Sequence, residues 1–502
     1  MLILLIAKGV YTDQKEHYFQ IDYSYTEDET FYNELLTPSN RKEFIIPKKN
    51  PFIPKTASVP NRELAENVFP EVVYNENGVK LYFGKDHEFL RPKGVISFKI
   101  LFPKETMSVK HKVYSRLYVA CVNESLNELS YPAKQAGLNY SIREGYEGIY
   151  IDVNGYKESA TALFELLLDH MVDFSITENK FLAIKDKVVR DYKNFALSDA
   201  HQQTREKSPD ILHHIKYTWE ESLPVAESAS LHGIKDYSKS LYEKTYTEAM
   251  VYGDFEKTDA EKTANLFRKK TKTKGVNRQE AFDLKYLKLD EPETIQYADN
   301  LLVNNSCFFR QYVLGEDSPQ NRALSKIISK ALQQPFYTEM RTNQQLGYIV
   351  WSYTNSLDET HYLNFLIQSG VYAADELNHR ANDYITSSGE ILRDMDIETF
   401  QQLIDSVIEE LEKKPMSIAE RARKLKTYIF EYDADYLRDQ DTIESLRTIN
   451  KETVANLIDS TVSPKSRRMV NVLTFAENHD NITKVKSSFS NLDTWKASRV
   501  YE

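Results

Sequence analysis

Residues 335–356 read PFYTEMRTNQQLGYIVWSYTNS, and this stretch carries the pattern that decides the fold. It ends a helix in a corner at Gly347 and then enters a strand. A polar turn and a further strand, YLNFLIQSG at 362–370, come next. A helix followed by a hairpin of strands predicts an α+β fold, in which a mostly antiparallel sheet is covered by helices on one face.

The same succession occurs earlier in the chain. AKQAGLNYSI, at 133–142, ends a helix at Gly137 and enters a strand, and IYIDVNGY at 149–156 supplies the next strand. Gly137 and Gly347 are separated by 210 residues, which is their difference in number. This period is far longer than that of stacking repeats, so it indicates duplication of a whole domain.

Two predicted helices support the duplication, because each carries four apolar residues at relative positions 0, 3, 7 and 11. These residues are Phe181, Ile184, Val188 and Tyr192 in the helix at 177–197, and Phe400, Leu403, Val407 and Leu411 in the helix at 397–413. Ser175 and Glu178 have the spacing of a capping box for the first helix. Apolar stripes also recur by chance in α+β proteins, and this alternative stays open.

The chain is therefore predicted to contain three segments. Two homologous α+β domains are expected at 71–280 and 281–502, each ending in an apolar strand and an acidic turn, AMVYGDFE and VNVLTFAE respectively. Residues 1–70 form an entry segment and a linker. The prolines of this linker favour an extended path; they are Pro47, Pro51, Pro54 and Pro60. MLILLIAKGV at 1–10 lacks the basic region of a signal peptide and is predicted to be a strand.

Composition excludes several classes of protein. With 41% hydrophobic and 28% charged residues in 502, the chain has the balance of a globular protein. Its formal net charge of −11 gives no electrostatic basis for nucleic-acid binding. The one basic run is interpreted as a solvated loop; it comprises Arg268, Lys269, Lys270, Lys272 and Lys274. No stretch has the length and apolar character of a membrane span, so no membrane partner is expected.

The two cysteines, Cys121 and Cys307, lie far apart in the sequence. Two thiols cannot form a disulfide framework for a chain of this size, so a reducing compartment is favoured. We therefore expect a cytoplasmic location.

Metal-binding motifs are absent from the sequence. Neither H-x-x-E-H nor H-E-x-x-H occurs, and after His87-Glu88 the position of the second histidine is occupied by Arg91. Without two histidines on one helix face, the usual three-ligand catalytic zinc site cannot form, so no metal ligand is predicted in this chain. The adjacent His213 and His214 point in different directions and are interpreted as structural or surface residues.

The corner at Gly347 holds two candidate functional side chains. Arg341 is a permanent cation with a planar fork of donors, and Tyr348 is a phenol just beyond the corner. Two donors aimed into a cleft could hold a peptide carbonyl as it becomes an oxyanion. The structural alternative, on residue types alone the better supported, is a solvated arginine, a helix-terminating glycine and a tyrosine that packs on the sheet.

A resemblance to a known family favours the functional interpretation. The stretch RTNQQLGY at 341–348, followed by LIQSG at 366–370, resembles the second-half signature of insulin-degrading enzyme and its pitrilysin relatives, the M16 metallopeptidases. Other blocks resemble the family in the same order along the chain. They are KEHYFQIDY at 15–23, PKKNPFIP at 47–54, FLRPKGVISFKILFP at 89–103 and SLNELSYPAKQAGLNYSI at 125–142.

The resemblance implies an enzyme of four homologous domains, whose two halves close as a clamshell around a chamber. This chain would be the C-terminal half, with residues 1–70 as the end of the second domain plus the linker, and 71–280 and 281–502 as the third and fourth domains. By resemblance, Arg341 and Tyr348 engage substrate as catalytic and substrate-binding residues. Met340, Asn343 and Gln344 depart from the family pattern without removing either donor.

Zinc is expected in a complementary N-terminal half, on the same or a separate chain, and this half is expected to be inactive alone. Its partners would be that zinc-bearing half and peptide substrates. If residues 1–10 are the closing strand of a preceding domain, their exposed edge is expected to be covered by another chain or copy. The alternative function is a degenerate binding or scaffold subunit that makes no catalytic contribution.

Overall fold

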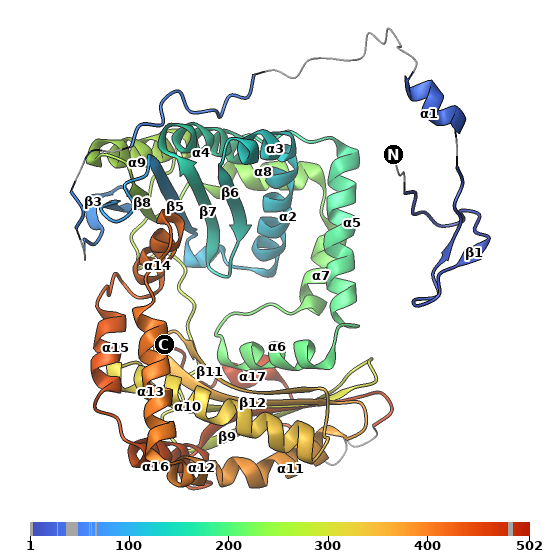
Figure 1. Ribbon diagram of the computed structural model, residues 1–502, viewed down its shortest axis with the longest axis vertical. Helices are drawn as coiled ribbons and strands as arrows, with labels where there is room; N and C mark the ends of the chain where they lie inside the picture. The colour runs from blue at the N-terminus through green and yellow to red at the C-terminus, as the bar shows by residue number, and fades with distance from the viewer. Residues whose placement is uncertain are drawn as a thin grey trace. The chain divides into compact units, whose positions relative to one another are not determined.

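The computed structural model describes residues 4–27, 29–36, 49–59, 61, 63–65, 68–479 and 485–502. The chain forms two compact units, Met1–Asn50 and Pro51–Glu502. The first unit contains a short antiparallel pair, β1 (Gln14–Lys15) and β2 (Asp22–Tyr23), and helix α1 (Glu29–Leu36). The second unit contains two sheets (Figure 1).

The first sheet has six strands in the order β3-β4-β8-β5-β7-β6. Their bounds are β3 Glu71–Glu76, β4 Val79–Lys85, β5 Lys93–Leu101, β6 Asn139–Glu144, β7 Gly148–Tyr156 and β8 Tyr246–Gly253. All neighbouring pairs are antiparallel except β4 with β8, which run parallel.

The second sheet has five strands in the order β11-β12-β10-β13-β9. Their bounds are β9 Glu293–Asn300, β10 Ser306–Glu316, β11 Ile349–Leu357, β12 Thr360–Ser369 and β13 Arg468–Phe475. Only β9 and β13 run parallel. Read from β9, this order repeats β4-β8-β5-β7-β6 of the first sheet, with its parallel pair at the same end. The two sheets therefore follow one plan.

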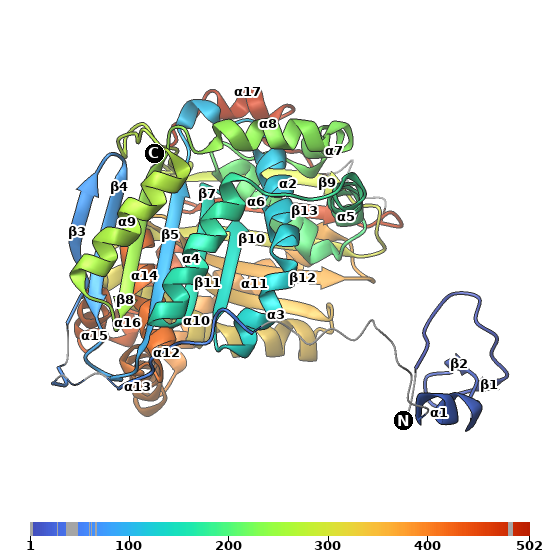
Figure 2. The ribbon, with the colours of Figure 1, turned by 90° about the horizontal axis from the view of Figure 1, so that it is seen from above.

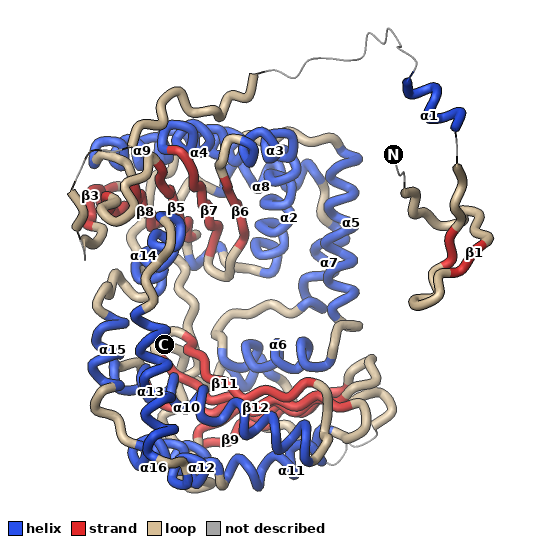
Figure 3. Tube along the Cα trace, in the orientation of Figure 1, coloured by secondary structure: helices blue, strands red, loops and turns tan. Residues whose placement is uncertain are grey.

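Helices surround both sheets (Figure 3). Those between β5 and β9 are α2 Val109–Ser125, α3 Asn127–Gln135, α4 Lys157–Val172, α5 Glu178–Phe195, α6 Ala200–Leu212, α7 Trp219–Ser228, α8 Leu231–Leu241 and α9 Lys257–Thr271, with a 3-10 turn, η1, at Lys104–Thr106. Those after β10 are α10 Pro319–Tyr337, α11 Ala374–Thr386, α12 Ser388–Asp394, α13 Ile397–Glu412, α14 Ile418–Glu431, α15 Arg438–Leu446, α16 Lys451–Val462 and α17 Leu492–Lys496, with a π-helical turn, η2, at Thr338–Asn343. The predicted α+β class with antiparallel-rich sheets is confirmed.

Each sheet is covered on both faces, and the expectation of a single covered face is wrong. Figure 2 shows α4 and α9 over one face of the first sheet. Its other face receives α14 from the second copy, where Leu425 and Ile429 join Met250 in one apolar cluster. In return, α6 of the first copy lies on β10 and β13, and Thr204 Oγ1 is 2.6 Å from Thr474 Oγ1. Coverage of both faces explains why nearly every residue of β5 and β10 is buried, including the polar side chains of Ser97, Lys99, Arg310 and Gln311.

Three local predictions are wrong. Of the predicted strand at 1–10, residues 1–3 lie outside the described residues and residues 4–10 form no strand; the strands described in their unit, β1 and β2, pair with each other, and a lone strand has no ladder to stabilise it. Helix α5 is capped by Thr177, which accepts from Lys180 N, so Ser175 is not its cap. The first three residues of the basic run end α9 rather than lying in a loop, and Lys270 pairs with Asp169 at 2.7 Å; Lys272 and Lys274 lie beyond the helix.

The structure neither confirms nor contradicts some other predictions. Pro47 and Pro60 lie outside the described residues, whereas Pro51 and Pro54 lie in chain without helix or strand. The domain boundaries predicted near 70 and 280 stay predictions, because both copies lie in one compact unit. Within the described residues, no helix is both long enough and apolar enough to cross a membrane.

Candidate functional site

The predicted site lies where α10 gives way to β11. Helix α10 ends at Tyr337, and the π-helical turn η2 follows directly. Such turns insert an extra residue into a helix and occur frequently at functional sites. Beyond it, Gln345 adopts the left-handed conformation with φ of 52°, so the prediction that Gly347 terminates the helix is wrong.

Buried and polar contacts fix the η2 turn. Met340 and Leu346 are fully buried beneath it, and Leu346 N donates to Met340 O at 2.9 Å. The Glu339 carboxylate accepts from Asn343 Nδ2 at 2.7 Å and Gln344 Nε2 at 2.9 Å. These hydrogen bonds, the one from Asn343 first, lower the pKa of Glu339. Asn343 and Gln344, the two polar residues that depart from the family pattern, therefore stabilise the turn through Glu339.

Gly347 has a different role from the one predicted. A Cβ atom at this position would lie 1.9 Å from the backbone oxygen of Gln368 in β12. Only glycine permits so close an approach of two backbones. The absence of a side chain therefore seats the corner directly against the end of β12.

Arg341 and Tyr348 are brought together at this corner. Arg341 Nη1 donates to the backbone oxygen of Tyr348 at 3.0 Å, and its guanidinium lies 4.4 Å from the centroid of the Tyr348 ring. The Tyr337 ring holds the same guanidinium at 5.1 Å. The Tyr348 side chain is 76% exposed. Both side chains therefore face solvent as a stacked pair rather than lying in a core.

The pair offers hydrogen-bond donors to a ligand. The guanidinium has donors beyond the one used on the backbone, and the phenol can donate from its hydroxyl. Such donors suit a carbonyl oxygen that gains negative charge. The structure brings together the two side chains that the sequence analysis singled out, and their catalytic and substrate-binding roles stay a prediction.

A metal site is not formed by the described residues, since no three His, Cys, Asp or Glu side chains gather as ligands there. His213 is buried between the rings of Tyr146 and Tyr286, with centroids 5.2 and 5.1 Å away. Burial lowers the pKa of His213 to about 3, so it stays neutral. The described part of the chain therefore offers no ligand set that fits a zinc ion.

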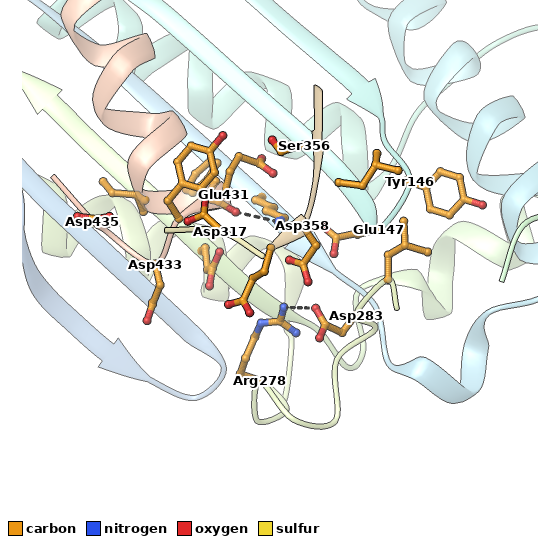
Figure 4. A pocket seen from close by; sticks show the side chains of 18 of the residues that line it. Tyr146, Glu147, Arg278, Asp283, Asp317, Ser356, Asp358, Glu431, Asp433 and Asp435 are labelled. Atoms are coloured by element: carbon orange, nitrogen blue, oxygen red, sulfur yellow. Dashed lines mark hydrogen bonds and ion pairs between the residues drawn. The ribbon is translucent and has the colours of Figure 1, made fainter. Parts of the chain in front are cut away.

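A cavity of about 910 Å³ lies where the two copies meet, at the other end of β11. Figure 4 shows its acidic lining, drawn from strands, loops and the end of α14. Nine carboxylates and five cations line it: Glu147, Glu248, Asp283, Asp317, Asp358, Glu359, Glu431, Asp433 and Asp435, with Lys80, Lys99, Arg278, Arg322 and Arg438. Burial raises the pKa of Glu248, Asp358 and Glu431. Sequence reasoning missed this cavity because its residues come from distant segments without a shared motif.

Asp317 organises one wall of the cavity. Its carboxylate accepts from Arg322 Nε at 3.0 Å, from both Nη atoms of Arg438 at 2.8 Å, and lies 2.8 Å from His361 Nε2. Burial opposes ionisation, but the hydrogen bonds from Arg322, Arg438 and His361 outweigh it and hold the pKa of Asp317 well below its usual range. This ion cluster ties α15 to the start of α10.

Comparisons with known proteins agree with this architecture. The family model described as the middle or third domain of peptidase M16 matches residues 1–225. The model described as the PQQ synthase PqqF-like C-terminal lobe domain 4 matches residues 327–426. The chain belongs to the M16 peptidase family. Both models describe later domains, so it corresponds to the C-terminal half of an M16 peptidase.

Individual relatives of this M16 chain cover nearly all of it. Insulin-degrading enzyme of Homo sapiens is 24% identical over 452 residues, which are 88% of this chain and 44% of that relative. The A-factor-processing enzyme of Saccharomyces cerevisiae is 23% identical over 467 residues, 91% of this chain and 45% of the relative. The chain therefore spans less than half the length of these curated relatives.

Solved structures share the fold. The crystal structure of pitrilysin matches with a TM-score of 0.80 and 20% identity over 91% of this chain and 49% of that chain. A structure described as a peptidase M16 inactive domain from Pseudomonas fluorescens matches with a TM-score of 0.60 and 12% identity, over 81% of this chain and 98% of that one.

Proposed function

We propose that this M16 chain is the half of a zinc metalloendopeptidase that carries no zinc and helps to enclose a chamber in which peptides are degraded. In this proposal, Arg341 and Tyr348 bind the substrate and stabilise the oxyanion that forms during hydrolysis. The observation that carries the proposal is their geometry: an exposed phenol stacked at 4.4 Å on a guanidinium, at a corner fixed from below.

The two side chains would act on one substrate carbonyl. As the carbonyl carbon is attacked, negative charge develops on its oxygen, and donors already in place stabilise that charge without reorganising. The Arg341 bond to the backbone of Tyr348 restrains the guanidinium, so the pair keeps its relative position. The phenol would contribute its hydroxyl as a hydrogen-bond donor.

The metal and the general base are proposed to lie in a complementary N-terminal half. Zinc would supply the activated water there. Support comes from this sequence, which lacks both zinc motifs, and from the length of the relatives, of which the chain spans less than half. We therefore expect the purified chain to hydrolyse no peptide until that half is added.

Replacement of Tyr348 by Phe tests the proposal. In the complex with the zinc-bearing half, Tyr348→Phe should lower kcat about a hundredfold, because one oxyanion donor is lost. Tyr131→Phe is the matched control, since Tyr131 is also exposed and lies near the corresponding corner of the first copy. An unchanged kcat for Tyr348→Phe, or stoichiometric zinc and hydrolysis in this chain alone, would refute the proposal.

The alternative is a degenerate peptidase-like subunit that grips peptides or stabilises an assembly. One observation favours this alternative: in the first copy the buried Leu138 follows the left-handed Gly137 and β6 begins at the next residue, so the same plan forms there without a counterpart of Tyr348. Peptide binding by this chain, with no hydrolysis after the zinc-bearing half is added, would support the alternative. Restored hydrolysis would exclude it.

A further inference from the structure

Gln368, at the end of β12, contacts both the Tyr348 corner and a helix of the other copy. We propose that Gln368 and His201 are positioning residues: through them, α6 of the first copy fixes where the second copy presents Arg341 and Tyr348. This inference rests on the proposed function of that pair. Neither residue need touch the substrate.

The first contact is a helix cap. His201 N, in the first turn of α6, donates to Gln368 Oε1 at 2.8 Å. Such N–H groups have no partner within their own helix, and Asp199, at the N-cap position, makes no side-chain capping bond. The side chain of Gln368 therefore caps a helix that lies more than 150 residues away in the sequence.

The same contact indicates which ring nitrogen of His201 carries a proton. A backbone N–H can only donate, so the amide oxygen of Gln368 faces α6. His201 Nδ1 lies 3.0 Å from that oxygen and must carry a proton to bond with it. The imidazole is 9% exposed, which shields both hydrogen bonds from water.

The backbone of Gln368 supports the corner itself. It pairs with Ile349, the first residue of β11, and its carbonyl oxygen meets Gly347. Tyr348 stands between those two residues. One residue thus touches α6 with its side chain and both neighbours of Tyr348 with its backbone.

A second contact restrains β11 from the same helix. The His201 ring meets the Trp351 ring edge-on at 5.1 Å, and the Arg205 guanidinium lies 5.9 Å from Trp351 and 5.8 Å from Tyr353. Helix α6 therefore contacts the first half of β11 through both His201 and Arg205. A displacement of about 1 Å in a catalytic group can cost a hundredfold in rate, so such support has kinetic weight.

Three variants in the complex with the zinc-bearing half test the inference. Gln368→Met keeps the length of the side chain but removes the acceptor, and should lower kcat about tenfold with little change in KM. Gln368→Glu keeps an acceptor for both N–H groups and should retain most of the rate. Ser208→Ala is the control, because it removes a hydrogen bond of α6 to Gln311, nearer the other end of the helix, and should leave kcat unchanged.

A double variant separates positioning from general destabilisation. If Gln368 acts through Tyr348, adding Gln368→Met to Tyr348→Phe should lower kcat by less than twofold, because the group being positioned is gone. A full tenfold further loss in the double variant would overturn the inference. So would an unchanged kcat for Gln368→Met when Tyr348→Phe alone is slow. Loss of the proposed function itself would appear differently, as an unchanged rate for Tyr348→Phe.

Discussion

The corners at Gly137 and Gly347 occupy the same place in two copies of one plan, yet only the second presents a tyrosine stacked on an arginine. In the first, Gly137 is left-handed with φ of 74°, Leu138 is buried, and β6 begins at the next residue. In the second, Gln345 is the left-handed residue and Leu346 is buried in the same way. Two further residues, Gly347 and Tyr348, then precede β11.

The difference teaches how one scaffold can carry chemistry in one copy and none in the other. In each corner, a buried leucine after the left-handed residue anchors the chain, so both corners support the fold in the same way. The π-helical turn and the two additional residues of the second corner bring Tyr348 out to solvent beside Arg341. A change of a few residues at an anchored corner is therefore enough to expose a new pair of hydrogen-bond donors.

The largest effect on stability is expected at the opposite end of the strands, where the copies also differ. Ser108 and Ser318 cap α2 and α10, but the preceding residue is Met107 in one copy and Asp317 in the other. Asp317→Asn should destabilise the protein by about 3 kcal/mol, because the buried Arg438 and Arg322 lose their counter-ion. Met107→Ala should cost much less. Urea titration of both variants checks this.

The pH dependence of the Asp317 effect has a definite sign. The folded-state pKa of Asp317 lies below its usual value of 3.8. Its contribution to stability is therefore present above pH 3.8 and is lost as the pH falls below that value. The wild type and Asp317→Asn should converge in stability on acidification; a gap that stays constant below pH 3.8 would contradict the assignment.

A smaller difference in the free energy of unfolding is expected between alanine substitutions at the two glycines. Gly347→Ala forces a Cβ against the backbone of Gln368 and should cost about 2 kcal/mol. Gly137→Ala meets no atom closer than 3.8 Å and should cost only about 1 kcal/mol, the penalty for a left-handed alanine. Melting temperatures of the two variants provide the measurement. Equal losses would show that the two glycines serve the same purpose after all.

The smallest effect is expected at the staple of the π-helical turn. Glu339→Gln weakens the hydrogen bonds with Asn343 and Gln344 and should cost less than about 0.5 kcal/mol, because the group is largely exposed. The lowered pKa of Glu339 means that its contribution is present above its usual value of 4.5 and disappears as the pH falls below it. Melting curves at pH 7 and pH 4 should differ more for the wild type than for the variant.

Local sequence patterns predicted helices and strands correctly where residues close in sequence are also close in space. The stripes at 177–197 and 397–413 became α5 and α13, and the predicted hairpin after Gly347 became β11 and β12. Arg341 and Tyr348 were paired correctly because one turn and one corner separate them. The capping residue of α5 was misplaced because Ser175 and Thr177 both suit a cap, and only geometry chooses between them.

Sequence alone could not reveal which contacts the two copies make with each other. Nearly every residue of β5 and β10 is buried, but polar residues such as Lys99 and Arg310 interrupt both sequences, so no pattern indicated that α14 and α6 cover a second face of each sheet. The ion cluster at Asp317 joins residues more than 100 positions apart. The contact between His201 and Gln368 is likewise invisible in the sequence, since glutamine and histidine form no motif at that separation.

By itself, the sequence of this protein determined the α+β plan, its duplication and the presence of two donors at one corner. Periodicity and close spacing act within a few residues, where the geometry of the chain leaves little choice. The tertiary structure alone decided which faces the helices cover, which residue lies in the left-handed region, and that α6 of the first copy contacts Gln368 in the second. Those outcomes depend on contacts between distant segments, whose free energies are set only when the whole unit has folded.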